Sequence, residues 1–278
     1  MSERVLMAGC GDLGQRVAAL LLARGDEVYA LRRNPPAQGG SPVQWLRADL
    51  TRAQSIPELA APITQLVYLP APDAREEQAY RAVFVAALGH LLRVLHGHPL
   101  KRVLFVSSSA VYGEHGSDWI DEDTPPAPLG FNGRVLLEAE HLLSGQAVPS
   151  IVLRLAGLYG PGRLQLLERL RAGSACAPRT PAHWANRIHV DDAAAAIAHL
   201  LHLREPQALY LGVDDTPLPL HQLYGELAER IGAPAVPDGP APPSIGSKKL
   251  SNARLRASGF RLQWPDARQG YASFLDAD

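Results

Sequence analysis

RVLMAGCGDLG, residues 4–14, joins a short apolar run to three glycines spaced G-x-G-x-x-G, and a helical pattern follows over residues 15–24. Each glycine has a physical role in such a loop. Gly9 allows a sharp turn off the strand, Gly11 lets backbone N–H groups approach a pyrophosphate, and Gly14 allows tight packing of the helix on the sheet. The helix N-terminus adds unpaired N–H donors. The stretch predicts a dinucleotide-binding unit, with a glycine-rich structural turn as the alternative.

Composition and charge indicate a globular protein. The 278 residues are 46% hydrophobic and carry a net charge of −1, so no basic field favours nucleic acid as a partner. No apolar run reaches the roughly 20 residues of a membrane span. The chain enters an apolar strand almost at once, which leaves no room for a signal peptide. Cys10 and Cys176 are too few for a disulfide framework or a metal cluster. We expect a soluble cytoplasmic protein without a metal.

The rest of the chain alternates apolar strands with helical patterns, which predicts an α/β fold. We expect a Rossmann-type doubly wound parallel sheet with a small C-terminal substrate-side lobe. The dinucleotide-binding core is expected at 1–160, with 186–215 returning to it, and the lobe at 161–185 and 216–278. The expected strands are 26–31, 43–46, 65–69, 101–106, 150–155, 186–190 and 208–211. The expected helices are 15–24, 51–59, 76–96, 132–143, 164–172, 191–203 and 219–231.

Two arginines follow the second strand and bear on the choice of cofactor. An NAD site places Asp or Glu near this point for the adenosine ribose, whereas arginine suits a 2′-phosphate. Arg32 and Arg33 stand there, while Asp26 and Glu27 lie at the opposite end of the strand. We therefore expect NADP, with NAD still possible. The alternative is that both arginines solvate an exposed loop.

Polar residues also follow later strands of the predicted sheet. In an open α/β sheet ligands bind outside the carboxyl ends of the strands. The serine cluster at 107–109 follows the strand at 101–106, so we expect it to face the cofactor. We expect the residues after the strand at 65–69 to contribute to the cofactor site as well. They are Leu69, Pro70 and Ala71.

Several motifs together resemble the extended short-chain dehydrogenases/reductases, the NAD-dependent epimerase/dehydratase family. They are the glycine loop, Ala48-Asp49-Leu50, FVSSSAVYG at 105–113, DEDTP at 121–125, LRLAGLYGP at 153–161 and IHVDD at 188–192. Ala8 stands where the family usually has the first of its evenly spaced glycines, so the glycine pattern differs slightly at this position. The resemblance implies that the dinucleotide is held by Gly9, Gly11, Asp12, Leu13, Gly14, Asp49 and Leu50, with the last two near the adenine ring.

The family's proton relay is incomplete in this sequence. The resemblance places its catalytic Ser/Thr at Ser108, and its Tyr and Lys, spaced Y-x-x-x-K, on the helix at 132–143. Those two positions hold Asn132 and Leu136. The chain has three lysines, and none lies four residues after a tyrosine. The sequence resembles an atypical subgroup of the family that carries N-G-R-V-L at this helix.

Other polar residues are weaker candidates, each with a structural alternative. Tyr112 is a substitute acid or packs under its loop. Arg134 contacts the cofactor or an anionic substrate, or is a solvated helix residue. Arg187 meets a substrate phosphate, or has no such role. His189 with Asp191–Asp192 is expected to tie a strand to the next helix rather than to bind metal.

Two functional hypotheses remain open at this stage. The first is an NADP-dependent oxidoreductase or epimerase-like enzyme acting on a small polar or nucleotide-linked substrate, with Ser108 polarising the reacting oxygen. The second is a non-catalytic NADP-binding module that reports the redox state to a partner. The resemblance also implies a possible homodimer through the helices at 76–96 and 132–143.

Overall fold

The computed structural model describes residues 2–36 and 41–275, and the chain divides into two compact units. The first unit comprises Met1–Ser108, Phe131–Arg154 and Ala194–Leu209. The second comprises Ser109–Gly130, Leu155–Ala193 and Tyr210–Asp278. The domain boundaries drawn from the sequence, at 160, 185 and 215, remain a prediction.

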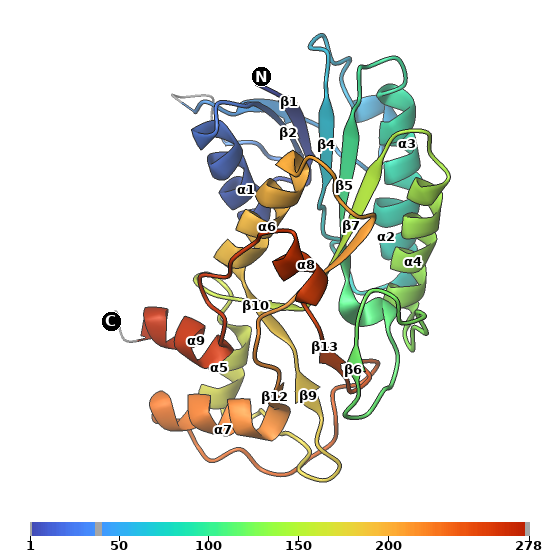
Figure 1. Ribbon diagram of the computed structural model, residues 1–278. Helices are drawn as coiled ribbons and strands as arrows, with labels where there is room; N and C mark the ends of the chain where they lie inside the picture. The colour runs from blue at the N-terminus through green and yellow to red at the C-terminus, as the bar shows by residue number, and fades with distance from the viewer. Residues whose placement is uncertain (1, 37–40, 276–278) are drawn as a thin grey trace. The chain divides into compact units, whose positions relative to one another are not determined.

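Most of a seven-stranded sheet lies in the first unit, and its strands follow the order β11-β7-β5-β4-β1-β2-β3 (Figure 1). β1 pairs in parallel with β2 on one side and with β4 on the other, and this order places a topological switch point between β1 and β4. The Rossmann-type doubly wound sheet is therefore confirmed. The strands are β1 (Arg4–Ala8), β2 (Glu27–Arg32), β3 (Gln44–Arg47), β4 (Gln65–Tyr68), β5 (Arg102–Ser108), β7 (Ser150–Leu155) and β11 (Leu209–Gly212).

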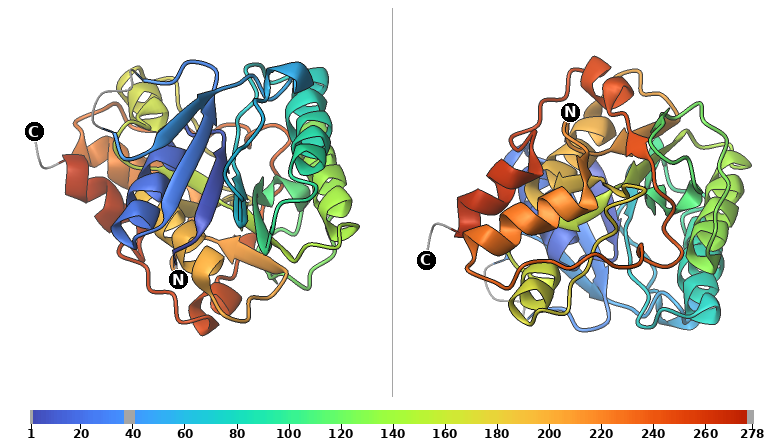
Figure 2. Two further views of the ribbon diagram at one scale, coloured as in Figure 1. Left: turned by 90° about the horizontal axis from the view of Figure 1, so that it is seen from above. Right: turned by 90° about the horizontal axis from the view of Figure 1, so that it is seen from below.

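Helices cover both faces of this sheet, which explains why its central strands are apolar throughout. Val5, Leu6, Met7 and Ala8 of β1 are fully buried, as a parallel sheet covered on both sides requires. α1 (Asp12–Ala23) and α6 (Val190–His202) lie on one face (Figure 2). The other face carries α2 (Glu77–Arg81), α3 (Ala87–Val94) and α4 (Phe131–Ser144).

The helix predicted over 76–96 is present but contains an irregular turn. α2 and α3 are joined through Ala82–Ala86, which form a π-helical turn. Phe84 of this turn packs edge-on against Phe105 of β5, with ring centroids 6.2 Å apart. π turns of this kind occur mostly as single interruptions of α-helices.

The helix predicted over 51–59 is wrong. Only Ala53–Ser55 are helical there, as a single 3-10 turn. The turn has no side-chain cap, and the Thr51 hydroxyl donates to Asp49 Oδ1 at 2.7 Å. Pro57 follows two residues after the turn and cannot supply the N–H that an α-helix interior needs.

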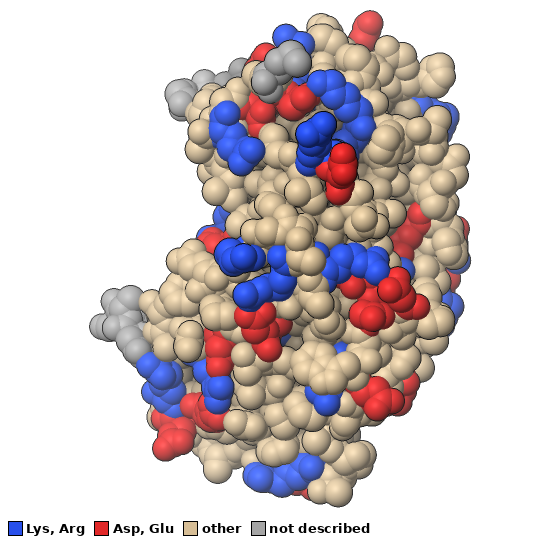
Figure 3. Space-filling model, viewed as in Figure 1, with Lys and Arg blue, Asp and Glu red and all other residues tan. Residues whose placement is uncertain are grey.

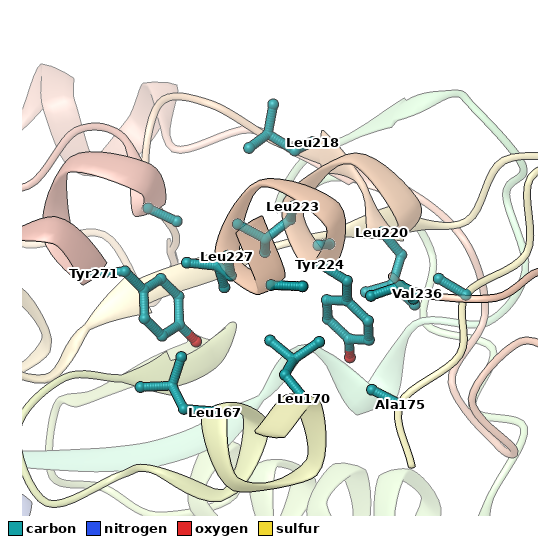
Figure 4. Close-up of a cluster of buried hydrophobic side chains, with 14 of the residues drawn as sticks. Leu167, Leu170, Ala175, Leu218, Leu220, Leu223, Tyr224, Leu227, Val236 and Tyr271 are labelled. Carbon is teal, nitrogen blue, oxygen red and sulfur yellow. The ribbon is translucent and has the colours of Figure 1, made fainter. Parts of the chain in front are cut away.

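The second unit is built from short elements around a separate apolar cluster (Figure 4). Leu167 and Leu170 of α5 (Gln165–Arg171) lie beneath α7 (Leu220–Arg230), beside Tyr271 of α9 (Ala267–Leu275). Three two-stranded sheets surround them. They are β8 (Gly157–Tyr159) with β10 (Arg187–His189), β9 (Trp184–Ala185) with β12 (Leu218–Pro219), and β6 (Trp119–Ile120) with β13 (Lys249–Leu250). A further short helix is α8 (Ala253–Ala257).

Charged side chains on the surface are mixed in sign rather than separated. On the face drawn in Figure 3, Lys and Arg gather beside Asp and Glu in small clusters between larger uncharged areas, in keeping with the net charge of −1. Within the described residues, the helices are too short or too polar to cross a bilayer.

A buried ion pair ties α4 to the sheet of the first unit. Glu140 of α4 accepts hydrogen bonds from Arg154 Nη2 at 2.6 Å and from Ser107 Oγ at 2.6 Å. Arg154 Nε donates to the same carboxylate at 3.1 Å, so the contact is bidentate. All three residues are buried. The pair therefore fixes the helix against β5 and β7 with directional bonds rather than by apolar contact alone.

We expect Arg154→Leu to lower the free energy of unfolding by about 3–5 kcal/mol, because it leaves the Glu140 carboxylate buried without its counter-charge. Urea denaturation followed by circular dichroism measures the change. Arg81→Leu is the matched control, since it breaks only exposed pairs with Glu77 and Glu138 and is expected to cost far less stability than Arg154→Leu. Equal losses in the two variants would contradict the assignment.

Candidate functional site

The glycine loop of the first unit has an open position above its turn. Gly9 has φ +95°, and a Cβ there would lie 2.4 Å from Pro70 Cα. A Cβ on Gly14 would lie 3.0 Å from the carbonyl oxygen of Gly9, whereas a Cβ on Gly11 would meet nothing within 4 Å. At Gly9 and Gly14 the absence of a Cβ therefore allows neighbouring backbone atoms to pack closely. Gly11 caps α1 at its N-terminus and faces space that a ligand can fill.

Cys10 lies inside this loop as a buried, protonated thiol. Its exposed fraction is 1%, and burial raises its pKa to about 11, opposed by the positive charge of Arg32. A thiol that stays protonated at neutral pH is a poor nucleophile. The burial of Cys10 therefore favours a space-filling role in the loop over that of a redox switch.

Of the two arginines after β2, Arg33 already has a carboxylate partner. Its guanidinium forms a bidentate contact with Asp73, which raises the pKa of Arg33 and lowers that of Asp73. The pair is largely solvent-exposed. Arg32 is half-buried, and its charge acts on Cys10 in the glycine loop. An anion bound after β2 would therefore contact Arg32 directly, whereas it would compete with the Asp73 carboxylate for the guanidinium of Arg33.

Asp49 shapes the turn after β3. Its carboxylate accepts the Thr51 N–H at 3.0 Å as well as the hydroxyl, and these bonds lower its pKa. Ser55 Oγ closes the turn by donating to the carbonyl of Asp49 at 2.7 Å. Leu50 beside it is half-buried. The carboxylate is thus oriented by its own turn before any ligand binds.

The residues after β4 lie against the glycine loop. The N–H of Leu69 donates to the carbonyl of Ala8 at 2.9 Å, and Pro70 is the residue that a Cβ on Gly9 would strike. Ala71 is exposed at the same turn. Two of the strand ends predicted to contribute to the cofactor site, those of β1 and β4, therefore meet in the structure.

Ser108 ends β5, beside the ion pair that anchors α4. Asn132, Leu136 and Glu140 are four residues apart and share one face of α4. Glu140 of that face contacts Ser107, so Asn132 and Leu136 lie on the side of the helix that faces the sheet, toward the end where β5 finishes. Asn132 is half-buried and Leu136 is buried. Arg134, two residues on, is exposed on another side.

Tyr112 belongs to the second unit and is packed beneath its loop. Only 1% of it is exposed, and its hydroxyl donates to the carbonyl of Asp121 at 3.0 Å. The adjoining backbone is tightly interlocked, since a Cβ on Gly246 would lie 2.2 Å from the Gly113 oxygen. The geometry favours the packing alternative for Tyr112 over a role as proton donor.

Arg187 faces inward in the second unit, toward buried titratable groups. It lies over Gly157, where a Cβ would come 2.6 Å from its Nη1. Burial raises the pKa of Tyr271, and a hydrogen bond from Arg187 opposes that rise. The Tyr271 ring stacks on Tyr159 with centroids 4.4 Å apart. The Arg187 guanidinium thus already has a hydrogen-bond partner within the protein, the Tyr271 hydroxyl.

The IHVDD motif links elements of the second unit. His189 is buried, and its Nδ1 accepts the backbone N–H of Asp191 at 3.2 Å. Asp192 accepts the backbone N–H groups of Gln263 and Trp264 at 2.7 and 2.9 Å. These contacts match the structural role expected for the motif. Over residues 2–36 and 41–275, no group of three or more His, Cys, Asp or Glu side chains is arranged to hold a metal ion.

Residues 5–212 match the model of the NAD dependent epimerase/dehydratase family. The chain belongs to this family. It is 29% identical over 275 residues to protein YeeZ of Escherichia coli strain K12, covering 95% of this chain and 97% of that one. It is 27% identical over 301 residues to a Streptomyces 3-diazoavenalumate denitrifying reductase, covering 96% and 98%. The structure of a Methylobacillus flagellatus protein assigned to the NAD-dependent epimerases/dehydratases is 44% identical, with TM-score 0.83 and coverage of 100% and 99%.

Two buried charged groups of this family member were not among the sequence candidates. Lys248 is 2% exposed, and its ammonium donates to the carbonyls of Gly246 at 2.9 Å and Tyr112 at 3.4 Å. Burial lowers its pKa to about 8. Asp214 is 2% exposed, and its Oδ2 has no hydrogen-bond partner among the described residues. Neither lies in a recognisable motif, so only the tertiary fold identifies them.

Asp214 predicts a pH dependence of stability. Burial raises its pKa to about 8, from 3.8 in the unfolded chain. Between those values the folded state binds a proton that the unfolded state has lost, so this contribution to stability falls as pH rises from about 4 to 8. We expect Asp214→Asn, which keeps an acceptor for Thr216 N–H, to remove the fall. Free energies of unfolding at pH 5 to 9 measure it. Parallel pH profiles for the two proteins would refute the prediction.

Proposed function

We propose that the chain binds a nicotinamide dinucleotide, preferentially NADP, and acts as an oxidoreductase or epimerase-like enzyme on a small polar or nucleotide-linked substrate. The observation that carries the proposal is the loop over β1 and α1. Gly9 and Gly14 are tightly packed there, while Gly11 opens to space at a helix N-terminus. The family and the name of the Streptomyces reductase support the same class of chemistry.

The residues of the first unit fit such a cofactor. The pyrophosphate would be held by the N–H groups of Gly11, Asp12 and Leu13 at the start of α1. Asp49 and Leu50 would flank the adenine end, and Leu69 to Ala71 would line the approach beside the loop. When bound, the nicotinamide ring donates or accepts a hydride.

The preference for NADP is proposed on the charge at the end of β2. Arg32 is half-buried and acts electrostatically on the glycine loop, so it is the stronger candidate for a 2′-phosphate. Arg33 would join it by exchanging Asp73 for the phosphate or by bridging both. NAD remains the alternative cofactor, with both arginines as surface residues.

Ser108 would donate a hydrogen bond to the reacting oxygen of the substrate. Asn132 can also hydrogen-bond that oxygen, but it cannot titrate, and the apolar Leu136 cannot lower the pKa of a neighbour. The loss of a positioned acid or base removes typically about 10²–10⁴ in rate. The proton is therefore proposed to come from water or from the substrate itself. Arg134 is proposed to meet an anionic part of the cofactor or substrate, whereas the contacts of Arg187 with Gly157 and Tyr271 favour its structural alternative.

The second candidate is a non-catalytic NADP-binding module that reports redox state to a partner. It is favoured by the same two residues, Asn132 and Leu136, which leave the family's relay without its titratable groups. Such a module must distinguish NADP⁺ from NADPH, because a ligand without differential affinity shifts no equilibrium.

We expect the pure protein to bind NADPH at least about tenfold more tightly than NADH in calorimetric titrations, which corresponds to about 1.4 kcal/mol. Arg32→Ala/Arg33→Ala is expected to remove the preference, because it removes both candidate contacts to the 2′-phosphate. Gly11→Val is expected to abolish binding of both dinucleotides without lowering the melting temperature, since its side chain fills open space.

Three outcomes of these titrations discriminate the proposals. Tight NADH binding that the arginine variant leaves unchanged would overturn the NADP assignment. Binding that survives Gly11→Val would place the dinucleotide elsewhere. Equal affinities for NADP⁺ and NADPH would exclude the redox-reporting module.

We also propose a homodimer through the outer faces of α2–α3 and α4. The two helices lie close, since a Cβ on Gly89 would reach Leu142 at 3.8 Å, and Ala86 is exposed beside them. We expect sedimentation equilibrium to give a dimer and Ala86→Arg to give a monomer, because a buried guanidinium would lack a partner. Ala257→Arg on α8 is the control and is expected to stay dimeric. A monomeric wild-type chain, or a dimeric Ala86→Arg variant, would contradict the proposal.

A further inference from the structure

A lysine ammonium lies between two indole rings in the second unit. Trp119 and Lys249 are paired residues of the parallel strands β6 and β13, and Trp184 belongs to β9 (Figure 1). Lys249 Nζ is 5.2 Å from the ring centroid of Trp119 and 5.0 Å from that of Trp184. Both distances fall within the range of cation–π contacts.

One of the two indoles is held by serines, and the backbone fixes the strand that carries the other. The Trp184 indole N–H donates to Ser117 Oγ at 3.0 Å, and its backbone N–H donates to Ser247 Oγ at 3.2 Å. The Lys249 N–H donates to the carbonyl of Asp118 at 3.0 Å, next to Trp119. The Trp119 side chain itself is 57% exposed. Trp119 therefore presents much of its apolar surface to solvent.

Lys249 differs in its ion pairing from three arginines of the second unit. Arg254, Arg256 and Arg268 each form an ion pair with an aspartate. In the part of the chain that the structure describes, no carboxylate forms an ion pair with Lys249. The preceding residue, Lys248, adds a second amine beneath the surface. The positive charge at Lys249 therefore favours the binding of an anionic ligand.

We propose that Trp119, Trp184 and Lys249 form a binding site for a planar aromatic carboxylate. The aromatic ring of the ligand stacks on the exposed face of Trp119, and its carboxylate accepts a hydrogen bond from the Lys249 ammonium. The binding site stands on these contacts alone.

The test is a calorimetric titration of the full chain with trans-cinnamate, without any dinucleotide. We expect Lys249→Gln and Trp119→Leu each to weaken binding by at least about tenfold, as expected for loss of a charge-assisted hydrogen bond or a stacking face. Lys101→Gln is the matched control, because this exposed lysine pairs with Glu3 in the first unit and is expected to leave the affinity unchanged.

Two further ligands separate the contributions of ring and charge. Cinnamyl alcohol keeps the planar ring without the carboxylate, and 3-cyclohexylpropionate keeps the carboxylate without the planar ring. Wild-type protein is expected to bind both at least about tenfold more weakly than cinnamate, and Lys249→Gln to lose the preference for acid over alcohol. Absence of cinnamate binding, or equal binding by Lys249→Gln, would overturn the site. Because no dinucleotide is present, these results are independent of the outcome for the proposed function.

Discussion

The close approach of Gly9 to Pro70 is the constraint on which the first unit depends. β1 and β4 are neighbours in the sheet, and their carboxyl ends meet where the chain leaves β1 with φ +95°. Only glycine allows both the conformation and the 2.4 Å separation that a Cβ would have from Pro70 Cα. The same turn aims the N-terminus of α1 at the switch point of the sheet. This close approach therefore joins the ends of β1 and β4 to the loop in which Gly11 faces open space.

The buried ion pair of Glu140 and Arg154 gives a second, independent constraint. It orients α4, and through the helical repeat it orients Asn132 and Leu136 as well. The helix α4 is held against the sheet by this pair, while the two positions that the family resemblance assigns to the relay hold Asn132 and Leu136. The contacts that hold the helix and the positions assigned to the relay are therefore different residues of α4.

The local parts of the structure were predictable from the sequence because they rest on neighbouring residues. The run from β1 through the glycine loop to α1 follows from apolar periodicity and glycine spacing, and its order is confirmed. The helix expected over 51–59 is absent for local reasons as well, since Asp49 binds the Thr51 N–H and hydroxyl in a turn of its own and Pro57 cannot supply the N–H of a helix interior. A competing side-chain bond of this kind is not visible in propensity alone.

Contacts between residues distant in sequence could not be predicted in this way. Arg33 and Asp73 are 40 residues apart, and no motif relates them. Their pairing nevertheless means that an anion bound after β2 would compete with Asp73 for Arg33. Lys249 and its two indoles come from three separate strands. The family motifs named positions for a dinucleotide, but the partners of those positions depend on the tertiary fold.

The two units differ in how they treat buried charge. In the first unit Glu140 lies against Arg154, and Asp26 lies 2.8 Å from His202. In the second unit the Lys248 ammonium contacts only neutral carbonyl oxygens among its hydrogen-bond partners, and Asp214 keeps an oxygen without one. Burial lowers the pKa of Lys248 to about 8 and raises that of Asp214 to about 8, and the charges of Glu114 and Arg187 oppose these two shifts. In the first unit the buried carboxylates lie against cations, whereas in the second unit desolvation outweighs the more distant charges and moves both pKa values toward neutrality.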